Sequence, residues 1–526
     1  MMRMMMATPA AALIAKTASP LRRRPFVSAL AASCTLMHAQ QTPSLTTGRR
    51  SASTSASMQP ATTTAATRAD TDWLALRPSF KINASNVRVL HEPSDFFSTL
   101  LKGVAQAKRQ ITLASLYLGT GARERELIEA LHLALSTRPE LRVNILLDCM
   151  RGSRGENEKK SSRAMLLPLL ERFGDRITLS LYHTPLLRSL KKKLIPAKFD
   201  ETISVQHMKL YMWDDTILLS GANLSQDYFT NRQDRYMLFE DCPEVVGFFQ
   251  KVSRVVEEHS YRVSSKNTLE ARRFDPLACS IDEFGASMAA GMRAILAQAP
   301  QHSPAQRPAS TEALVLPSIQ LGCFGFKHDQ AITSHILSST PTDCAVWVAS
   351  GYFNFPESYQ QLVLGQSQGA TKTEFKILTA APLANGFFGA RGIPGLVPAA
   401  YTSIERAFLR RVEALNAPDR VQLFEWMKPQ WTFHAKGMWF YHASAPTPHM
   451  TLVGSSNFGI RSILRDIEAQ VALVTDNGQL QQQLHVERER LFGASTRVTL
   501  ASLNSQPERA VSTSVALTTQ VIKTFF

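Results

Sequence analysis

One pattern occurs twice in this chain, in 203-ISVQHMKLYMWDDTILLSGANLSQDYFTNRQDRY-236 and in 432-TFHAKGMWFYHASAPTPHMTLVGSSNFGIRSILRDIEAQ-470. Each copy opens with His-x-Lys, formed by His207 and Lys209 in the first copy and by His434 and Lys436 in the second. Of the 13 histidines in the chain, only these two are followed by lysine two residues later. The repeat predicts two related halves that each contribute one set of residues.

Both copies continue in the same way after the lysine. A strand-like run ends in glycine and asparagine, and an acidic residue stands 11 positions after each asparagine. The matched residues are Gly221, Asn223 and Asp234 in the first copy and Gly454, Ser456, Asn457 and Glu468 in the second. We expect all of them to support the site, with the asparagines as ligands of phosphate oxygens.

The spacing of each motif predicts its geometry. Residues i and i+2 of a strand point to the same face, so His207 and Lys209 should project together, and so should His434 and Lys436. Asp214 and Asp215 would turn the chain, and Thr216–Ser220 would return as the partner strand. Joining the halves would place two imidazoles, two ammonium groups and two amides around one pocket.

This set of groups suits a phosphodiester. Ammonium and amide groups can hold the non-bridging phosphate oxygens. One imidazole can attack phosphorus and form a phosphohistidine, while the other protonates the leaving oxygen and then acts as the base that activates the acceptor hydroxyl. Asp234 and Glu468 are expected to accept the other ring N–H and so fix each tautomer. We expect no metal and no cofactor, because the lysines supply the positive charge.

The chain around the motifs alternates strand-like and helical patterns. Ile111–Leu118 reads as a strand, Glu124–Leu135 as a helix and Val143–Asp148 as a further strand, which favours a parallel α/β sheet. Ala345–Ser350 and Glu374–Thr379 begin a second series of strands. The expected domains are a leader at 1–69, a first half at 79–265, a connecting segment and linker at 266–312, a second half at 313–500 and a tail at 501–526.

Composition narrows the class of protein. The chain has 526 residues, 44% of them hydrophobic, which supplies a core and excludes a disordered chain. No run of about 18 apolar residues occurs, which argues against a transmembrane helix. The first 69 residues hold eight positive charges and no acid, so the other 457 residues carry only +7 of the net +15. The high net charge is therefore weak support for nucleic-acid binding, and we expect no nucleic-acid partner.

Residues 1–69 are rich in Ala, Ser, Thr, Met and Arg and lack acids, which is typical of an organelle transit peptide. We expect import into the mitochondrion, with the plastid as the less favoured organelle. A secretory signal with Arg22–Arg24 as its basic region, or a disordered tail without an address, are the alternatives.

The two His-x-Lys copies and the residues that follow them resemble the phospholipase D superfamily. The motif of that superfamily is His-x-Lys-x4-Asp followed by Gly and Asn. His207, Lys209 and Asp214 match the motif in full. Within the superfamily, the chain is most similar to the eukaryotic mitochondrial CDP-diacylglycerol–glycerol-3-phosphate 3-phosphatidyltransferases, over roughly residues 79–492. The stretches that carry this likeness are ASLYLGTG (114–121), LLDCMRGSRG (146–155), NLSQDYFTNRQDRY (223–236), SGYFN (350–354), NGFFGARG (385–392), PAAYTSIER (398–406) and FHAKGMW (433–439).

The resemblance implies a fold, a reaction and a set of residues. The fold would be two α/β sandwiches with mixed central sheets that share an active-site cleft. The reaction would convert CDP-diacylglycerol and sn-glycerol 3-phosphate to phosphatidylglycerophosphate and CMP, the entry step to cardiolipin, on the matrix side of the inner membrane. His207, Lys209, Asp214, His434 and Lys436 would be catalytic. The second copy departs from the motif, because Tyr441 stands where Asp is expected, and this asymmetry favours His207 as the nucleophile.

Other readings stay open. A phosphodiesterase that acts on phospholipid or nucleic acid would use the same motifs with water as acceptor, and a membrane scaffold with a decayed site would keep only the fold. The glycines within Ala114–Gly121 do not favour ATP binding, because no Lys-Ser/Thr pair follows them. A basic cluster, formed by Arg188, Lys191, Lys192, Lys193 and Lys198, is either a solvated loop or a contact with an anionic membrane.

Overall fold

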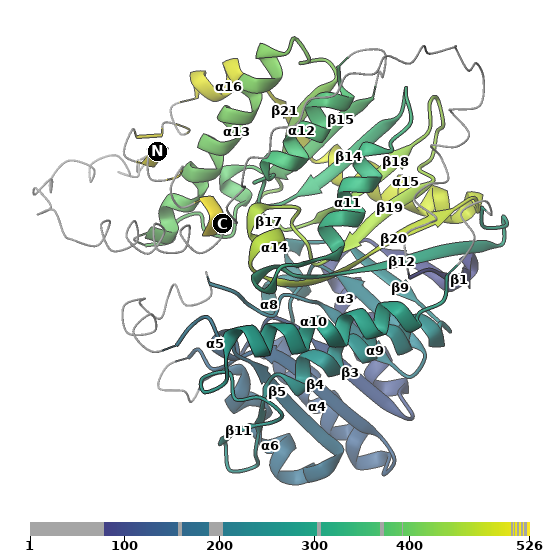
Figure 1. The fold of residues 1–526 in the computed structure, drawn as a ribbon, viewed down its shortest axis with the longest axis vertical. Helices are drawn as coiled ribbons and strands as arrows, with labels where there is room; N and C mark the ends of the chain where they lie inside the picture. The colour runs from purple at the N-terminus through teal and green to yellow at the C-terminus, as the bar shows by residue number, and fades with distance from the viewer. Residues whose placement is uncertain are drawn as a thin grey trace, which may run out of the picture. The chain divides into compact units, whose positions relative to one another are not determined.

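The computed structural model describes residues 78–155, 160–188, 203–301, 307–368, 373–391 and 393–506, together with scattered positions between 509 and 525. The expected transit peptide at 1–69 lies outside the described residues, and so do four of the five members of the basic cluster, Lys191, Lys192, Lys193 and Lys198. The described part consists mainly of two large mixed sheets, one for each half of the chain (Figure 1).

The first sheet has nine strands and carries the first motif. Its strands in spatial order are β11 (Leu269–Ala271), β10 (Tyr261–Val263), β5 (Ile177–Tyr182), β4 (Arg142–Asp148), β3 (Gln110–Ala114), β6 (Leu210–Trp213), β7 (Thr216–Ser220), β9 (Tyr236–Phe239) and β2 (Val87–Leu90). Strands β3, β4 and β5 are parallel, and the other neighbours pair antiparallel. The first motif leads directly into β6, beside the parallel strands.

The second sheet repeats this arrangement around the second motif. Its main path is β1 (Phe80–Asn83), β12 (Glu312–Leu321), β20 (Ile467–Thr475), β19 (Met450–Gly454), β18 (Lys436–Tyr441), β14 (Ala345–Ser350), β15 (Glu374–Ala380), β16 (Val421–Trp426) and β21 (Ser495–Val498), and β13 (Phe326–Lys327) pairs with β12. Strands β14, β15 and β16 are parallel, like β3, β4 and β5. A two-stranded parallel pair, β8 (Arg232–Gln233) with β17 (Thr432–Phe433), links the two halves.

Helices cover both sheets and form three hydrophobic cores. The first sheet shares one core with α3 (Pro93–Gln106), α4 (Ala122–Thr137) and α6 (Ser162–Phe173). The second sheet shares another with α11 (His328–Ser338), α12 (Glu357–Gln366) and α13 (Val397–Ala414). A third core joins residues of both sheets to α9 (Pro243–Glu258), α10 (Ile281–Gln298) and α15 (Gly478–Gly493). The other α-helices of the described residues are short: α5 (Cys149–Gly152), α8 (Gln226–Thr230), α14 (Ile460–Leu464) and α16 (Leu500–Ser505).

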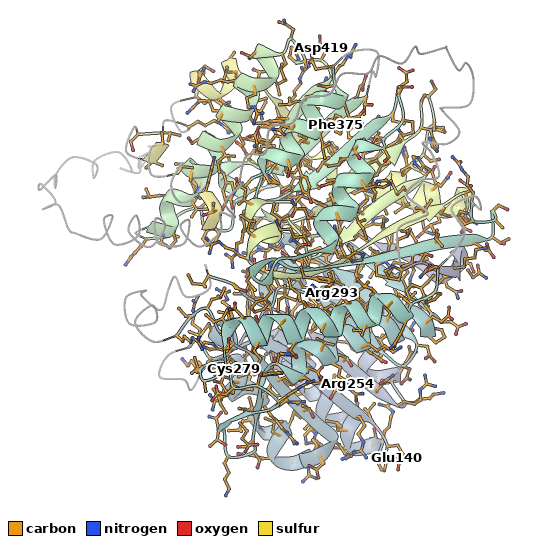
Figure 2. All side chains as sticks on the ribbon, in the orientation of Figure 1. Glu140, Arg254, Cys279, Arg293, Phe375 and Asp419 are labelled. Carbon is orange, nitrogen blue, oxygen red and sulfur yellow. The ribbon has the colours of Figure 1, made fainter. Side chains whose placement is uncertain are left out.

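Side chains fill the space within these layers, as Figure 2 shows, and Phe375 of β15 is fully buried. The predicted fold class, two α/β halves with mixed sheets, is confirmed. The residue directly before each motif pairs with the other half, Gln206 with Ile467 and Phe433 with Gln233, so both motifs lie where the halves meet.

Several predicted elements coincide with the structure. The strands predicted at 216–220 and 345–350 are β7 and β14 with the same bounds, and the helix predicted at 124–135 lies within α4. The strand predicted at 111–118 is too long, because β3 ends at Ala114. Just beyond the strand, the Ser115 hydroxyl donates to the Tyr117 carbonyl at 3.1 Å.

Some segments have partners that local patterns do not indicate. Strand β1 pairs antiparallel with β12 of the second sheet, with Phe80 opposite Val315, although it precedes every strand of the first half. The connecting segment at 266–312 contains α10, which is 18 residues long and packs in the shared core. Beyond residue 500, the Asn354 side chain donates to the Lys523 carbonyl at 2.7 Å. Among the helices of the described residues, none is long and apolar enough to cross a bilayer.

A buried arginine fastens the two halves together. Arg235, just before β9, donates to both carboxylate oxygens of Glu487 on α15, at 2.9 and 2.7 Å. It also donates to the Leu452 carbonyl and the Thr451 hydroxyl, and its guanidinium lies 3.9 Å from the Trp439 ring centroid. The side chain is fully buried, so its charge depends on these partners.

Replacing Arg235 with alanine is expected to lower the free energy of unfolding by about 3–5 kcal/mol, because Glu487 would remain as an uncompensated buried charge. Urea denaturation monitored by circular dichroism measures the change. The matched control is Arg88→Ala, since Arg88 pairs with Glu240 at 3.7 Å with both side chains about half exposed. That control should change stability by less than about 0.5 kcal/mol. Equal losses for the two variants would contradict the assigned role of Arg235.

Candidate active site

Two backbone pairings between the halves bring both copies of the motif to one place. The His207 N–H donates to the Ile467 carbonyl at 2.9 Å, and the Ile467 N–H donates to the Val205 carbonyl at 3.0 Å. In the other copy, the His434 N–H donates to the Gln233 carbonyl at 2.8 Å. Each histidine therefore pairs with the residue directly before the acid of the other half.

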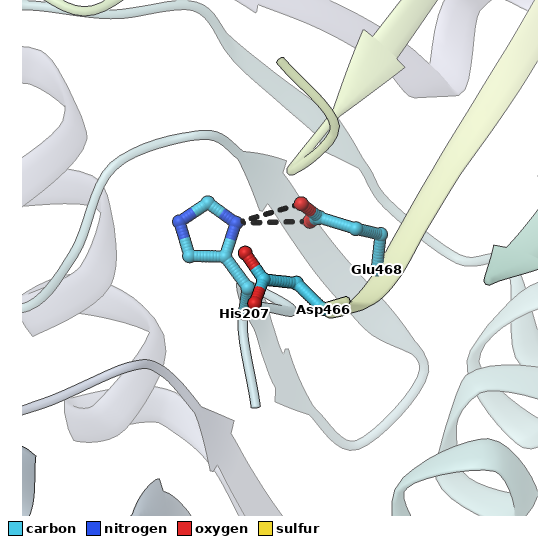
Figure 3. Close-up of side chains that lie close together, drawn as sticks. All are labelled: His207, Asp466 and Glu468. Carbon is cyan, nitrogen blue, oxygen red and sulfur yellow. Dashed lines mark hydrogen bonds and ion pairs between the residues drawn. The ribbon is translucent and has the colours of Figure 1, made fainter. Parts of the chain in front are cut away.

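The imidazole of His207 faces the carboxylate of Glu468, as Figure 3 shows. His207 Nδ1 lies 3.0 Å from both carboxylate oxygens. The buried carboxylate also accepts the hydroxyls of Ser455 at 2.5 Å and Ser462 at 2.8 Å. This network assigns the ring proton to Nδ1 and leaves the lone pair on Nε2. Among the described residues, no hydrogen-bond partner reaches His207 Nε2.

His434 is held by Asp234 in the corresponding way. His434 Nδ1 lies 2.6 Å from Asp234 Oδ2, and both residues are buried. Unlike His207, His434 has a partner at its other nitrogen, because Nε2 lies 3.2 Å from the Tyr228 hydroxyl. Both acids thus lie beside the Nδ1 atom of a histidine, as the sequence predicts, but each acid contacts the histidine of the other half.

The lysines complete a compact buried cluster. Lys209 Nζ donates to the His207 carbonyl at 2.6 Å, and Lys436 Nζ lies 2.7 Å from His434 Nδ1 and 3.6 Å from Asp234 Oδ2. Burial lowers the pKa of both imidazoles well below the usual value, and the neighbouring ammonium groups lower it further. Both imidazoles are therefore neutral at neutral pH.

The two acids titrate near neutrality. Burial raises the pKa of Glu468 to about 7 and that of Asp234 to about 6, although nearby lysines act in the opposite direction. Small changes of pH in this range therefore change the charge of the groups that hold the imidazoles.

The asparagines stand at the ends of β7 and β19. The buried Oδ1 atoms of Asn223 and Asn457 have no hydrogen-bond partner among the described residues. Buried polar atoms are rarely left unpaired, so these amides retain capacity for a ligand. Ser456, next to Asn457, accepts the Phe458 N–H at 3.3 Å and so supports this turn.

Glycine stands at one matched position in each copy of the repeat, for different steric reasons. A Cβ on Gly221 would lie 2.6 Å from Asp234 Oδ1 and 2.8 Å from Lys436 Nζ, so only glycine lets those groups approach. A Cβ on Gly454 would instead meet the Cβ of Gln470 at 2.2 Å. Gly221 therefore shapes the cluster, whereas Gly454 allows β19 to pack against β20.

Asp214 is the motif residue that the structure keeps apart from the cluster. Its carboxylate accepts the backbone N–H groups of Lys108 and Arg109 at 2.8 Å, at the start of β3. Asp214 has φ of 46° in the turn between β6 and β7. The Asp214 carboxylate thus contacts the backbone beside the turn and not the cluster, and the catalytic role expected for it stays a prediction that these contacts do not support. Tyr441, at the matching position, accepts Arg488 Nε at 3.0 Å and also lies outside the cluster.

Several residues of the site escaped the sequence-based prediction. Tyr228 and Ser462 each stand five residues after the motif asparagine, so aligning the two copies would have singled them out. The half-buried Tyr352 ring lies 5.5 Å from the His434 ring, centroid to centroid. The Arg232 guanidinium lies 4.8 Å from the centroid of the Tyr228 ring. Arg232 and Tyr352 occur in no repeated pattern, and their contacts place them beside Tyr228 and His434.

One grouping in the described part of the chain has the geometry to hold a metal ion. Ligand atoms of His207, Asp466 and Glu468 lie within 4.8 Å of one another (Figure 3). Each acid already has partners, because Asp466 accepts the Val205 N–H at 3.1 Å and Arg461 Nε at 2.8 Å. The hydrogen bonds account for this grouping without a metal.

Known proteins resemble this chain in sequence and in fold. No protein-family model matches the chain. Two similar relatives are the mitochondrial CDP-diacylglycerol–glycerol-3-phosphate 3-phosphatidyltransferases of Mus musculus and Homo sapiens. The mouse protein is 42% identical over 484 residues, covering 86% of each chain. The human protein is 41% identical over 484 residues, covering 86% of this chain and 85% of its own.

A solved structure supports the fold. Phosphatidylserine synthase of Haemophilus influenzae Rd KW20 aligns with a TM-score of 0.69 and 18% identity, over 88% of this chain and all of that one. At this identity the likeness shows the fold alone, whereas the relatives at about 41% identity show the family. The chain belongs to the CDP-diacylglycerol–glycerol-3-phosphate 3-phosphatidyltransferase family.

Proposed function

We propose that this chain transfers the phosphatidyl group of CDP-diacylglycerol to sn-glycerol 3-phosphate and releases CMP. The names of the relatives support both substrates. The observation that carries the chemistry is the pair of buried imidazoles, each with Nδ1 on a carboxylate of the other half. The product, phosphatidylglycerophosphate, is a precursor of phosphatidylglycerol and cardiolipin.

In the first step, Nε2 of His207 attacks the phosphorus that is esterified to diacylglycerol. An N–P bond forms, the P–O bond of the diphosphate breaks, and CMP leaves with its electron pair. Lys209 and Lys436 offset the negative charge on the phosphoryl oxygens, and the motif asparagines donate hydrogen bonds to them. The absence of a partner at Nε2 among the described residues supports His207, rather than His434, as the nucleophile.

In the second step, the acceptor hydroxyl attacks the phosphatidyl-histidine. Nε2 of His434 takes the hydroxyl proton, the new P–O bond forms, and the N–P bond to His207 breaks. The proton then passes to water. This base role suits His434 because its low pKa keeps it neutral. The proton that the second imidazole was expected to give the leaving oxygen is not required, because a phosphate leaves readily as an anion.

The same proposal includes a location. The mitochondrial names of the relatives support a mitochondrial enzyme, and we place it on the matrix side of the inner membrane. Its lipid substrate resides in a bilayer, so the chain must contact a membrane peripherally or receive the lipid from one. The described member of the basic cluster, Arg188, donates to the Cys279 carbonyl at 2.6 Å.

An assay of the purified full chain tests this function. With CDP-diacylglycerol and excess chelator, CMP release should require glycerol 3-phosphate and should yield one phosphatidylglycerophosphate per CMP. Release that is independent of glycerol 3-phosphate, or hydrolysis of phosphatidylcholine or DNA at a comparable rate, would instead identify a phosphodiesterase. Loss of activity in chelator would contradict the metal-free mechanism.

The pKa values predict an acidic limb in the pH profile. As the pH falls through about 7, Glu468 binds a proton and loses the negative charge that holds the Nδ1–H of His207. kcat/KM for CDP-diacylglycerol should therefore fall below about pH 7, whereas the imidazoles remain neutral because their pKa values lie lower. Profiles between about pH 5.5 and 9 measure this limb. Glu468→Gln should lower the rate and remove the limb near pH 7, and an unchanged limb would assign it to another group.

A further inference from the structure

Exposed apolar side chains gather on two segments that follow neighbouring strands of the second sheet. Eleven large hydrophobic residues of the described chain are exposed, and four of them are Leu383, Phe387, Phe388 and Met427. We call these four residues the apolar rim. Leu383 is 59% exposed and Phe388 is 55% exposed, values typical of polar residues.

The topology brings the two segments together. Strands β15 and β16 are parallel neighbours, with Ala380 opposite Trp426 at their ends. The Ala381 N–H donates to the Trp426 carbonyl at 3.0 Å, so the chain leaves both strands at the same end, where their C-termini lie side by side. Residues 382–391 and 427–431 therefore start side by side, although about 45 residues separate them in sequence.

The apolar rim begins beside the active site. The Phe387 ring lies 6.0 Å from the Tyr352 ring, which in turn lies 5.5 Å from the His434 ring. A Cβ on Gly386 would lie 3.2 Å from both the Tyr352 hydroxyl and Arg232 Nη2. One aromatic ring thus separates this exposed surface from a proposed catalytic imidazole.

The charges on these segments have one sign. Arg391 and Lys428 are exposed, and residues 382–391 and 427–431 contain no acid. Exposed apolar side chains with basic neighbours are the combination that binds the boundary between headgroups and acyl chains of an anionic bilayer. An exposed apolar cluster of this kind marks an interaction surface.

We propose that the apolar rim docks on an anionic bilayer and seats its side chains at the headgroup boundary. This inference rests on the proposed function, because a lipid substrate must bring its diphosphate to His207 while its acyl chains remain in an apolar phase. Docking beside Tyr352 places the membrane surface next to the cluster. The bilayer is favoured over a protein partner because the substrate itself comes from the bilayer.

The test compares rim variants with a matched control for vesicle binding. Leu383→Ser/Phe388→Ser removes two exposed apolar side chains from the rim, and Leu133→Ser/Leu269→Ser removes two from elsewhere on the surface. Co-sedimentation of the full chain uses phosphatidylcholine vesicles with and without phosphatidylglycerol. The rim variant should bind the anionic vesicles at least about tenfold more weakly, and the control should stay within about twofold. Equal binding by both variants, or equal binding to neutral vesicles, would overturn the proposal.

A fluorescent reporter locates the contact. Phe388→Trp should shift its emission to the blue on anionic vesicles and be quenched by brominated acyl chains, whereas Leu133→Trp should not. Vesicle binding without quenching of the Phe388→Trp reporter would place the membrane contact elsewhere and overturn the proposal. A rim variant that dissociates a dimer while vesicle binding is unchanged would identify a second copy as the partner, with the same consequence.

Turnover separates this inference from the proposed function. With short-chain CDP-diacylglycerol below its micelle concentration, the rim variant should retain activity within about threefold, and it should lose at least about tenfold on vesicles. Absence of turnover of either substrate by the unaltered chain would refute the proposed function. The vesicle-binding measurements would still test whether the apolar rim docks on the bilayer. Equal loss on soluble and vesicle substrates would show that the rim shapes the site and does not dock.

Discussion

Replacing His207 with alanine is expected to lower phosphatidyl transfer by about 10⁴-fold or more, with the fold intact. The reason is that Nε2 of His207 supplies the electron pair for the N–P bond, and no other described side chain offers a neutral, unpartnered nitrogen beside Glu468. Initial rates of CMP release with CDP-diacylglycerol and glycerol 3-phosphate measure the loss. His132→Ala is the control, because His132 is exposed on α4 and should leave the rate unchanged.

The covalent intermediate distinguishes the two histidines. With CDP-diacylglycerol labelled in its acyl chains, His207→Ala should form no labelled protein. His434→Ala should accumulate it, because CMP leaves without a proton but the acceptor hydroxyl then lacks its base. The label should be stable in alkali and labile in acid, as a phosphoramidate is. Label on His207→Ala and none on His434→Ala would reverse the two roles.

The carboxylates should produce the second large effect, and they should act across the halves. Glu468→Gln and Asp234→Asn are each expected to lower turnover by about 10²–10⁴-fold, because an amide can present a donor to Nδ1 and favour the wrong tautomer. Because Glu468 holds His207, Glu468→Gln should slow formation of the phosphatidyl-enzyme. Because Asp234 holds His434, Asp234→Asn should slow its breakdown.

Rapid-quench measurement of labelled protein separates these outcomes. The labelled enzyme should accumulate in Asp234→Asn and stay scarce in Glu468→Gln. The control is Glu374→Gln, since Glu374 is a half-exposed acid of β15 paired only with Lys376 among its described contacts. If Asp234→Asn instead blocked formation of the intermediate, each acid would be serving the histidine of its own half, contrary to the crossed geometry.

The repeated motif can be identified from the sequence because its histidine and lysine stand close together in the chain. His207 and Lys209 stand two residues apart in an extended segment, so their spacing predicts that they project together. Strands β7 and β14 were predicted with their bounds, since uninterrupted β-branched and apolar runs next to turn residues mark buried strands. Likeness to a family over most of the chain then indicated the reaction. These inferences require only neighbours in sequence or the matching of whole stretches.

Other features depend on contacts between distant parts of the chain. Strand β1 joins the second sheet by pairing with β12, which lies more than 200 residues later in the chain. No local pattern in residues 80–83 predicts that partner. Asp214 belongs to the motif, yet it accepts hydrogen bonds from a strand that begins about 100 residues earlier. The apolar rim likewise arises because the parallel strands β15 and β16 have their C-terminal ends side by side.

Residue types and their periodic order thus specify which groups this protein carries: two imidazoles, two amines, two amides and two acids, on an α/β framework of two halves. Which acid serves which imidazole follows from the short parallel pairings at Gln206 with Ile467 and at β8 with β17. Local propensity cannot encode such a choice, because the backbone groups of one strand can pair with those of any other strand. The packing of buried side chains across the fold selects one pairing. The crossed arrangement is therefore a property of the folded chain.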